Sequence, residues 1–149
     1  EHMSLYCAEL GVLISGDMLL PRISTNISVM ASNPHGDPLG LFLASIDGFR
    51  ALPENTLVLP SHGRPFHGLH ARVDQLHAHH AERCEVLLDA CRDEPKSAAD
   101  LIGVLFGREL PDPHQTMFAM GEAIAHLNYL EHAGKLQRIE ENGLISYVS

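Results

Sequence analysis

The sequence predicts an α+β protein in two parts, an alternating β-β-α-β segment over residues 1–68 and a mostly helical segment over residues 69–149. A chain of 149 residues can bury one sizeable core or two small ones, and 45 % hydrophobic with 19 % charged residues is typical of folded domains. Near residue 68 the apolar pattern changes from short runs to steps of three and four. A hairpin signal at Asn142-Gly143 closes the chain.

Short apolar runs between turn residues define the first part. Its predicted elements are strands at 3–8 and 11–15, a loop at 18–37, a helix at 38–50 and a buried strand at 55–60. Asp37 is a suitable cap for the helix, and Pro38 fits its first position. The residues of the loop are turn formers, spread too densely for a regular element.

Helical spacing followed by a hairpin defines the second part. Its predicted elements are helices at 69–91, 98–106 and 114–133 and strands at 136–139 and 144–148. Ser97 is placed to cap the second helix, and Gly134 is placed to end the third. Three helices and a hairpin in this order are the outline of a winged-helix domain.

Composition argues against several classes of protein. Nineteen acidic and ten basic residues give a net charge of −9, which repels phosphate backbones and disfavours nucleic acid as a partner. No apolar run approaches the ~20 residues that cross a bilayer, and the first residues lack the features of a signal peptide. The three cysteines are widely spaced, as in reduced proteins. We therefore expect a cytoplasmic protein without a membrane segment.

Two side chains that follow predicted strands are suited to bind metal ions. Asp17 follows the second strand in Gly16-Asp17, and His62 follows the last strand in Ser61-His62-Gly63. A carboxylate can bridge two metal ions and an imidazole can bind one, and loops after strands hold such groups in place. Spacing alone leaves the ordinary alternatives open, since an Asp in a turn is often a cap and a loop His is often a surface residue.

Three stretches, HMSLY at 2–6, LISGD at 13–17 and LVLPSHG at 57–63, occur in an order that carries a family resemblance. They are similar to the stretch after the third motif, the strand ending in the bridging aspartate and the last motif of metallo-β-lactamase superfamily hydrolases. The later helices and hairpin resemble the winged-helix domain attached to one branch of these enzymes. The resemblance implies a partial αββα metallo-hydrolase sandwich over 1–68 and an accessory winged-helix domain over 69–149.

The same resemblance implies roles for three residues in a centre of two zinc ions. Asp17 would bridge the ions, His62 would bind one of them, and His2 matches a histidine of the third motif that is not itself a ligand. Hydroxide held by the ions would attack an ester, thioester, lactone or phosphodiester in a small-molecule substrate. The sequence does not distinguish among these bonds.

Most ligands of such a centre do not occur in this sequence. The H-x-H-x-D-H signature and the first histidine of the third motif are missing, so we expect the chain to begin within the hydrolase domain. Ser61 stands where the family more often has glycine, which alters the turn before His62. Catalytic zinc takes about three protein ligands plus a water, and Asp17 with His62 supplies two. We therefore expect weak or absent zinc binding and no activity from this chain alone.

Two further groups of polar residues have simpler explanations than catalysis. His77, His80 and Cys84 have the spacing of a chelating site, but His80 and Cys84 fall on the apolar stripe of the long helix, which favours packing residues. Four polar residues after Asp17 are suited to line a substrate pocket, but such clusters are most often turn residues. They are Arg22, Ser24, Thr25 and Asn26. We assign no catalytic residue among them.

Two functions other than hydrolysis stay open. Half of a sheet sandwich has an unpaired edge and an uncovered apolar face, which predicts a homo-oligomer and is consistent with a non-catalytic dimerisation or interaction module. A DNA-binding winged-helix regulator is disfavoured, because residues 96–149 hold four basic and seven acidic residues and the helix at 114–133 has no Lys or Arg.

Overall fold

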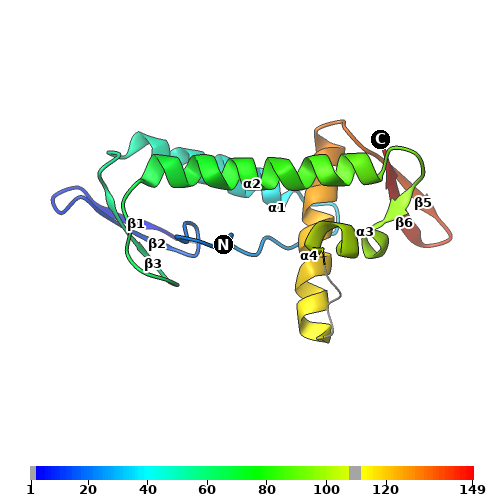
Figure 1. The fold of residues 1–149 in the computed structure, drawn as a ribbon, viewed down its shortest axis with the longest axis horizontal. Helices are drawn as coiled ribbons and strands as arrows, with labels where there is room; N and C mark the ends of the chain where they lie inside the picture. Colours follow the sequence, from blue (N-terminus) through cyan, green and yellow to red (C-terminus); the bar gives the residue numbers. More distant parts are fainter. Residues whose placement is uncertain (1–2, 108–111) are drawn as a thin grey trace. The chain divides into compact units, whose positions relative to one another are not determined.

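The computed structural model describes residues 3–107 and 112–149. Its elements are β1 (Leu5–Cys7), β2 (Val12–Gly16), α1 (Pro38–Asp47), the 3-10 helix η1 (Gly48–Ala51), β3 (Leu57–Pro60), α2 (Leu69–Ala90), β4 (Lys96–Ser97), α3 (Ala98–Phe106), α4 (Pro113–His132), β5 (Gln137–Glu141) and β6 (Leu144–Val148) (Figure 1). This order confirms the α+β class. Among the described residues, no helix combines the length and apolarity that crossing a bilayer requires.

The chain divides into two compact units. Unit 1 consists of Glu1–Thr25 and Leu41–His79, and unit 2 consists of Asn26–Gly40 and His80–Ser149. Each unit holds one three-stranded sheet, with the strand orders β1-β2-β3 and β4-β6-β5. The division into domains at residue 68 stays a prediction.

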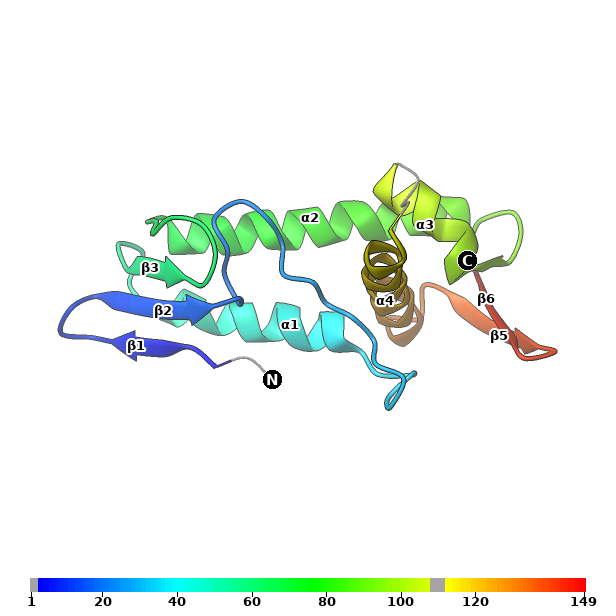
Figure 2. The ribbon, with the colours of Figure 1, turned by 90° about the horizontal axis from the view of Figure 1, so that it is seen from below.

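The sheet of unit 1 has β2 at its centre (Figure 2). β1 pairs antiparallel with β2, and β3 pairs parallel with β2. A parallel pair requires a crossover connection, and α1 lies in the segment that connects β2 to β3. Leu13 and Val58 on the central strand and β3 are fully buried, whereas Leu5 and Ile14, opposite each other on β1 and β2, are exposed. One face of this sheet therefore carries core residues and the other carries exposed apolar ones.

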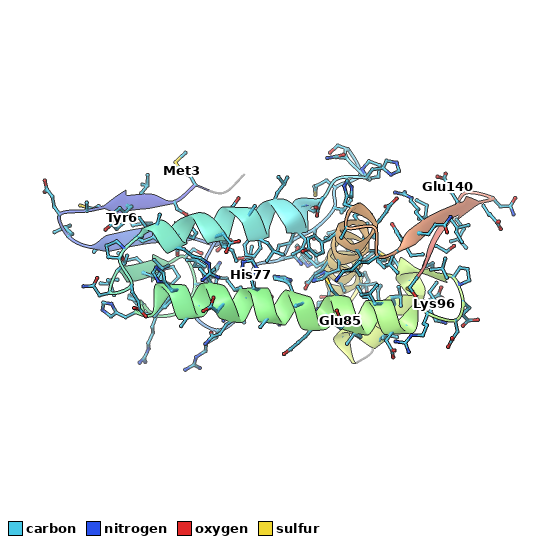
Figure 3. The ribbon with its side chains drawn as sticks, turned by 90° about the horizontal axis from the view of Figure 1, so that it is seen from above. Met3, Tyr6, His77, Glu85, Lys96 and Glu140 are labelled. Atoms are coloured by element: carbon cyan, nitrogen blue, oxygen red, sulfur yellow. The ribbon has the colours of Figure 1, made fainter. Side chains whose placement is uncertain are left out.

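Polar contacts join α1 and α2 within unit 1. The His77 Nε2 atom lies 3.0 Å from Asp47 Oδ1, and Figure 3 shows His77 on the side of α2 toward α1. Arg50, which follows α1, pairs with Asp74 of α2 at 2.7 Å. Arg50 also donates to Asp47, and this hydrogen bond lowers the pKa of the Asp47 carboxyl. The two helices also carry buried apolar side chains in unit 1, among them Leu43, Ile46, Leu69, Val73 and Leu76.

A buried amide organises the interior of unit 2. Asn128 of α4 donates from Nδ2 to the carbonyls of Pro34 and Gly36, at 3.0 and 2.9 Å, and accepts from the Tyr147 hydroxyl at 3.1 Å. Because all three partners bind the same side chain, the long loop before α1 is held against α4 and the last strand. The predicted loop at 18–37 is irregular, as expected, and the Asn128 hydrogen bonds hold its last part, at Pro34 and Gly36.

Local cap signals mark the helix starts. The Gly40 amide donates to Asp37 Oδ1 at 2.8 Å, which confirms the predicted cap of α1. Ser97 and Asp100 form a reciprocal capping box at the start of α3. Asn142 and Gly143 both have positive φ, as the hairpin turn between β5 and β6 requires. Strand β4 was not predicted, because its two residues pair only with a strand about fifty positions away.

Candidate functional site

Asp17 and His62 lie at the carboxyl ends of β2 and β3, which are parallel neighbours in the unit 1 sheet. Pro60 is paired with Gly16, and the Ser61 amide donates to the Gly16 carbonyl at 3.1 Å, so the two strands end together. Asp17 follows β2 and His62 follows β3 by two positions. The His62 Nε2 atom lies 3.7 Å from Asp17 Oδ1. The sheet thus brings together the two side chains singled out from sequence, while their role as metal ligands stays a prediction.

Hydroxyl groups hold the turn that carries Asp17. Ser15 is fully buried, and its hydroxyl donates to the Leu19 carbonyl at 3.0 Å. The Met18 amide donates to the Ser15 carbonyl at 3.1 Å, and the Thr25 hydroxyl donates to the Asp17 carbonyl. The backbone of Asp17 is therefore fixed from both sides. Its side chain remains 39 % exposed, so the carboxylate is accessible to a ligand.

The turn that carries His62 depends on a glycine. Gly63 has φ +88°, and a Cβ atom there would lie 2.6 Å from Cγ of Pro21. A side chain at this position would strain the backbone and collide with the loop after β2. The imidazole of His62 is 71 % exposed, so solvent or a ligand reaches it freely.

Ser61 contacts the candidate ligand directly. Its hydroxyl donates to Asp17 Oδ1, the same oxygen that faces His62. From sequence, Ser61 was interpreted as a change in the turn alone. The contact joins residues 44 positions apart, and only the pairing of β2 with β3 brings them together. Ser61 is therefore a site residue that sequence reasoning missed.

The donors present fit one part of a metal centre. Across residues 3–107 and 112–149, no group of three or more His, Cys, Asp or Glu side chains is placed to hold a metal ion. His2, which the resemblance placed behind the ligands, lies outside the described residues. Catalytic zinc takes about three protein ligands plus a water. Asp17 and His62 are suited to contribute two ligands, and they do not complete a site by themselves.

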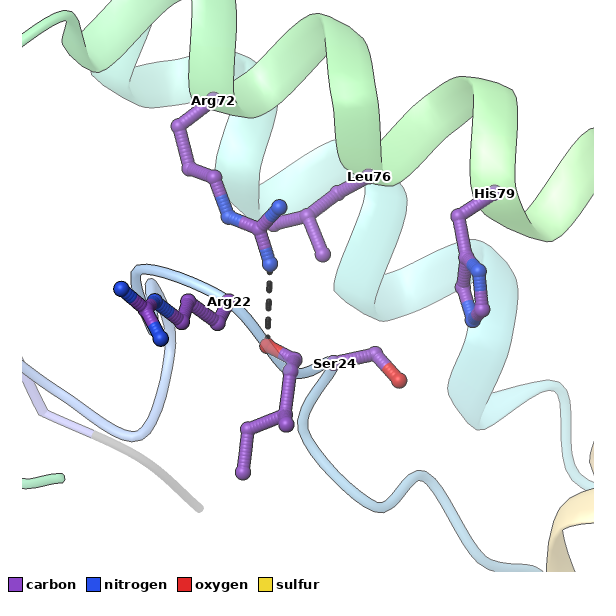
Figure 4. A pocket seen from close by; sticks show the side chains of 6 residues that line it. Arg22, Ser24, Arg72, Leu76 and His79 are labelled. Atoms are coloured by element: carbon purple, nitrogen blue, oxygen red, sulfur yellow. Dashed lines mark hydrogen bonds between the residues drawn. The ribbon is translucent and has the colours of Figure 1, made fainter. Parts of the chain in front are cut away.

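Two surface hollows lie in unit 1, and one of them includes His62. The His62 hollow, of about 630 Å³, is lined by Pro21, Arg22, Ile23, His62, Gly63, Arg64, Pro65 and Phe66. The Arg72 hollow, of about 270 Å³, is lined by Arg22, Ile23, Ser24, Arg72, Leu76 and His79 (Figure 4). Both share Arg22 and Ile23, from the stretch 22–26 that sequence reasoning set aside as turn residues. These residues follow Asp17 closely in the sequence, and this closeness is the feature from which their place near the site could have been predicted.

The histidines of α2 have structural partners. His80 and Cys84 are buried, as their place on the apolar stripe predicts. His80 Nδ1 lies 3.0 Å from Nε2 of His126, which is buried on α4. His126 Nδ1 lies 2.8 Å from the Glu122 carbonyl, so it donates there, and its Nε2 accepts from His80. His77, in unit 1, contacts Asp47 of α1.

Comparisons with known proteins agree with this arrangement. Residues 84–149 match the family of metallo-β-lactamase-like C-terminal domains. A β-lactamase domain protein from Burkholderia ambifaria is 49 % identical, with a TM-score of 0.93 over 97 % of this chain and 43 % of that protein. A metallo-β-lactamase family protein from Thermus thermophilus is 34 % identical, with a TM-score of 0.82 over 97 % of this chain and 44 % of that one. Comparison with curated proteins gave no match.

These matches define an α+β chain of the metallo-β-lactamase type, with two small sheets and four α-helices among the described residues. Residues 84–149 are a metallo-β-lactamase-like C-terminal domain, and 97 % of the chain is similar to two solved proteins of the metallo-β-lactamase type. The resemblance inferred from sequence is thereby confirmed. The chain spans less than half the length of the two solved relatives.

Proposed function

We propose that Asp17 and His62 are the contribution of this chain to a metal-dependent hydrolytic centre whose other ligands come from the remainder of a longer protein. The observation that carries the proposal is the 3.7 Å approach of an exposed imidazole to an exposed carboxylate at the shared end of two parallel strands. Ligands and substrates bind in sheets of this kind at the carboxyl ends of the strands. The reaction class is hydrolysis of an ester, thioester, lactone or phosphodiester.

Each residue at the ends of β2 and β3 has a definable task in this proposal. Bound zinc would supply a hydroxide nucleophile at neutral pH and polarise the bond that breaks. The Asp17 carboxylate offers one oxygen to Ser61 and keeps lone pairs for a metal ion. His62 offers Nε2 from a turn fixed by Gly63. The His62 hollow, next to both, is the place where a small-molecule substrate would bind.

A zinc titration of the isolated 149-residue chain, followed by competition with a chromophoric chelator, tests the assignment. We expect weak binding that Asp17→Asn and His62→Gln each abolish. Asp93→Asn and His114→Gln are matched controls, because both side chains are exposed and lie in unit 2. Binding that survives both site variants would contradict the ligand roles. Two tightly held zinc ions per chain would contradict the incomplete site.

We further propose that unit 2 is an accessory winged-helix domain. The second half of α2 is followed by β4, α3, α4, β5 and β6, and β4 pairs with β6, which is the order such domains have. Helix α4 contains no Lys or Arg, which argues against a role in reading DNA. A role in packing against other protein surfaces fits this composition better.

A non-catalytic interaction module is the second candidate function. Leu5 and Ile14 form a cross-strand pair that is 59 % and 49 % exposed on the outer face of the unit 1 sheet. An apolar pair in this position favours association with another copy of the chain, and hence a homo-oligomer.

A further inference from the structure

Arginines without acidic partners gather at the two hollows. Elsewhere in the described part of the chain every arginine has an ion pair, as seen for Arg50 with Asp74, Arg83 with Glu122, Arg92 with Asp89 and Arg138 with Glu131. Arg22, Arg64 and Arg72 have no ion pair with any described carboxylate. Arg22 and Arg64 line the His62 hollow, and Arg22 and Arg72 line the Arg72 hollow. In a chain of net charge −9, the described arginines that lack an ion pair therefore all line these two hollows.

Arg72 is fixed in the wall of its hollow by neutral acceptors. Its Nε donates to the Leu20 carbonyl at 2.6 Å, and its Nη2 donates to the Ile23 carbonyl at 2.9 Å (Figure 4). Its Nη1 donates to the Gln75 side chain at 3.1 Å. Burial lowers the pKa of Arg72, because these carbonyls do not replace all of its hydration. The guanidinium stays protonated at neutral pH, so the wall keeps a full positive charge.

Arg22 and Arg64 lie on the loops that follow β2 and β3. Both side chains are exposed, and neither forms a hydrogen bond or ion pair with a described residue. Arg22 and Ile23 line both hollows. The Ser24 hydroxyl and the His79 ring also line the Arg72 hollow (Figure 4). These groups offer hydrogen-bond donors around an unfilled space of about 270 Å³.

We propose that the two hollows form one subsite that binds a phosphate group of a small-molecule substrate, with Arg22 lining both hollows and Arg64 and Arg72 lining one each. The proposal rests on the proposed function, since it takes the His62 hollow as the place of the substrate. Guanidinium groups pair with carboxylate and phosphate alike, but three unbalanced cations match a dianion better than a single charge. The negative charge of the rest of the chain repels a long polyanion, which favours one phosphate group over nucleic acid.

An NMR titration of the full chain with inorganic phosphate, at constant ionic strength and without zinc, tests the subsite. We expect saturable amide shifts confined to residues 21–25, 63–66 and 72–79. Arg22→Gln and Arg64→Gln should each weaken phosphate binding by about fivefold or more, as expected for loss of a charge-assisted hydrogen bond. Arg92→Gln, an exposed arginine paired with Asp89, is the matched control and should leave the affinity unchanged.

The competing outcomes are separable. Shifts that do not saturate, or that the control variant reduces equally, would overturn the subsite. Acetate binding as tightly as phosphate would also overturn it, because a single charge would then suffice. Since zinc is absent from this titration, phosphate binding that survives alongside a failed zinc titration would reject the metal assignment and leave the anion subsite standing.

Discussion

The hydroxyl side chains around Asp17 have two different tasks: some hold the backbone of the turn, and one contacts the Asp17 carboxylate. Ser15 and Thr25 bind backbone carbonyls and fix the turn around Asp17. Ser61 binds the carboxylate itself. A hydrogen bond of this kind orients a metal-binding carboxylate and leaves its remaining lone pairs for the ion. A variant without the Ser61 hydroxyl should therefore have a lower metal affinity, although both candidate metal ligands remain.

Replacing Ser61 with alanine should weaken zinc binding at Asp17 and His62 by about tenfold, the lower end of the effect of such supporting hydrogen bonds. The loss follows from the freed rotation of the Asp17 carboxylate. Competition with a chromophoric chelator measures it. Ser45→Ala is the control, since Ser45 is exposed and its hydroxyl binds the Leu41 carbonyl within α1. Equal zinc affinity in Ser61→Ala and wild type would show that the hydroxyl does not orient the ligand.

The buried imidazole pair of unit 2 makes a second prediction for single residues. His126→Leu should lower the free energy of unfolding by about 1–3 kcal/mol, because the Nδ1 donor of His80 loses its acceptor in a buried setting. His80→Leu should cost a similar amount, since it removes the other member of the same hydrogen bond. The double variant should cost less than the sum of the two. Urea unfolding of the four proteins measures this coupling, and strictly additive losses would rule it out.

The capping box at the start of α3 should contribute to the stability of the whole helix. Ser97→Ala should cost about 1 kcal/mol, because the hydroxyl caps the Asp100 amide. Hydrogen bonds from Ser97 lower the pKa of Asp100 below its usual 3.8, so this carboxylate stabilises the fold above that pH. Its contribution is lost as the pH falls through the lowered folded value. Asp100→Asn should therefore destabilise α3 at neutral pH, and its effect should shrink as the pH falls below 3.8. Hydrogen exchange of the α3 amides measures both effects.

Elements were predictable from sequence where their signals are local. Asp37 and Ser97 each cap a backbone amide three residues later, so the start of α1 and of α3 is marked in the local sequence. Asn142-Gly143 marks the last hairpin turn in the same way. The pairing of β4 with β6, the Ser61 contact with Asp17 and the imidazole pair depend on segments distant in the chain, and no local pattern encodes them. The candidate ligands were predictable because both follow strands. The arginine subsite was not, because its members come from two loops and a helix.

Charge and apolar surface are unevenly distributed over the chain. Arginines without an ion pair line the two hollows, whereas exposed large apolar side chains occur in both units. Three of them, Leu5, Tyr6 and Ile14, lie on the paired strands β1 and β2. The two edges of this sheet also differ. On β3, Val58 exchanges backbone hydrogen bonds with Phe66, at 2.8 and 3.0 Å, so that edge is partly covered. Strand β1 is the other edge, and its three residues are exposed. Association is therefore expected through β1 and the outer face.

Replacing Ile14 with threonine should weaken self-association of the chain. Ile14 is 49 % exposed opposite Leu5, and threonine keeps the β-branched shape that a strand favours while removing apolar area. The loss is about 1 kcal/mol per chain, and a two-fold symmetric contact counts it twice, so the dissociation constant should rise by about tenfold or more. Sedimentation velocity over a concentration series measures it. Leu144→Thr, an exposed strand residue of unit 2, should leave association unchanged. Equal effects of the two variants would place the contact elsewhere, and a wild-type chain that stays monomeric at every concentration would reject the homo-oligomer.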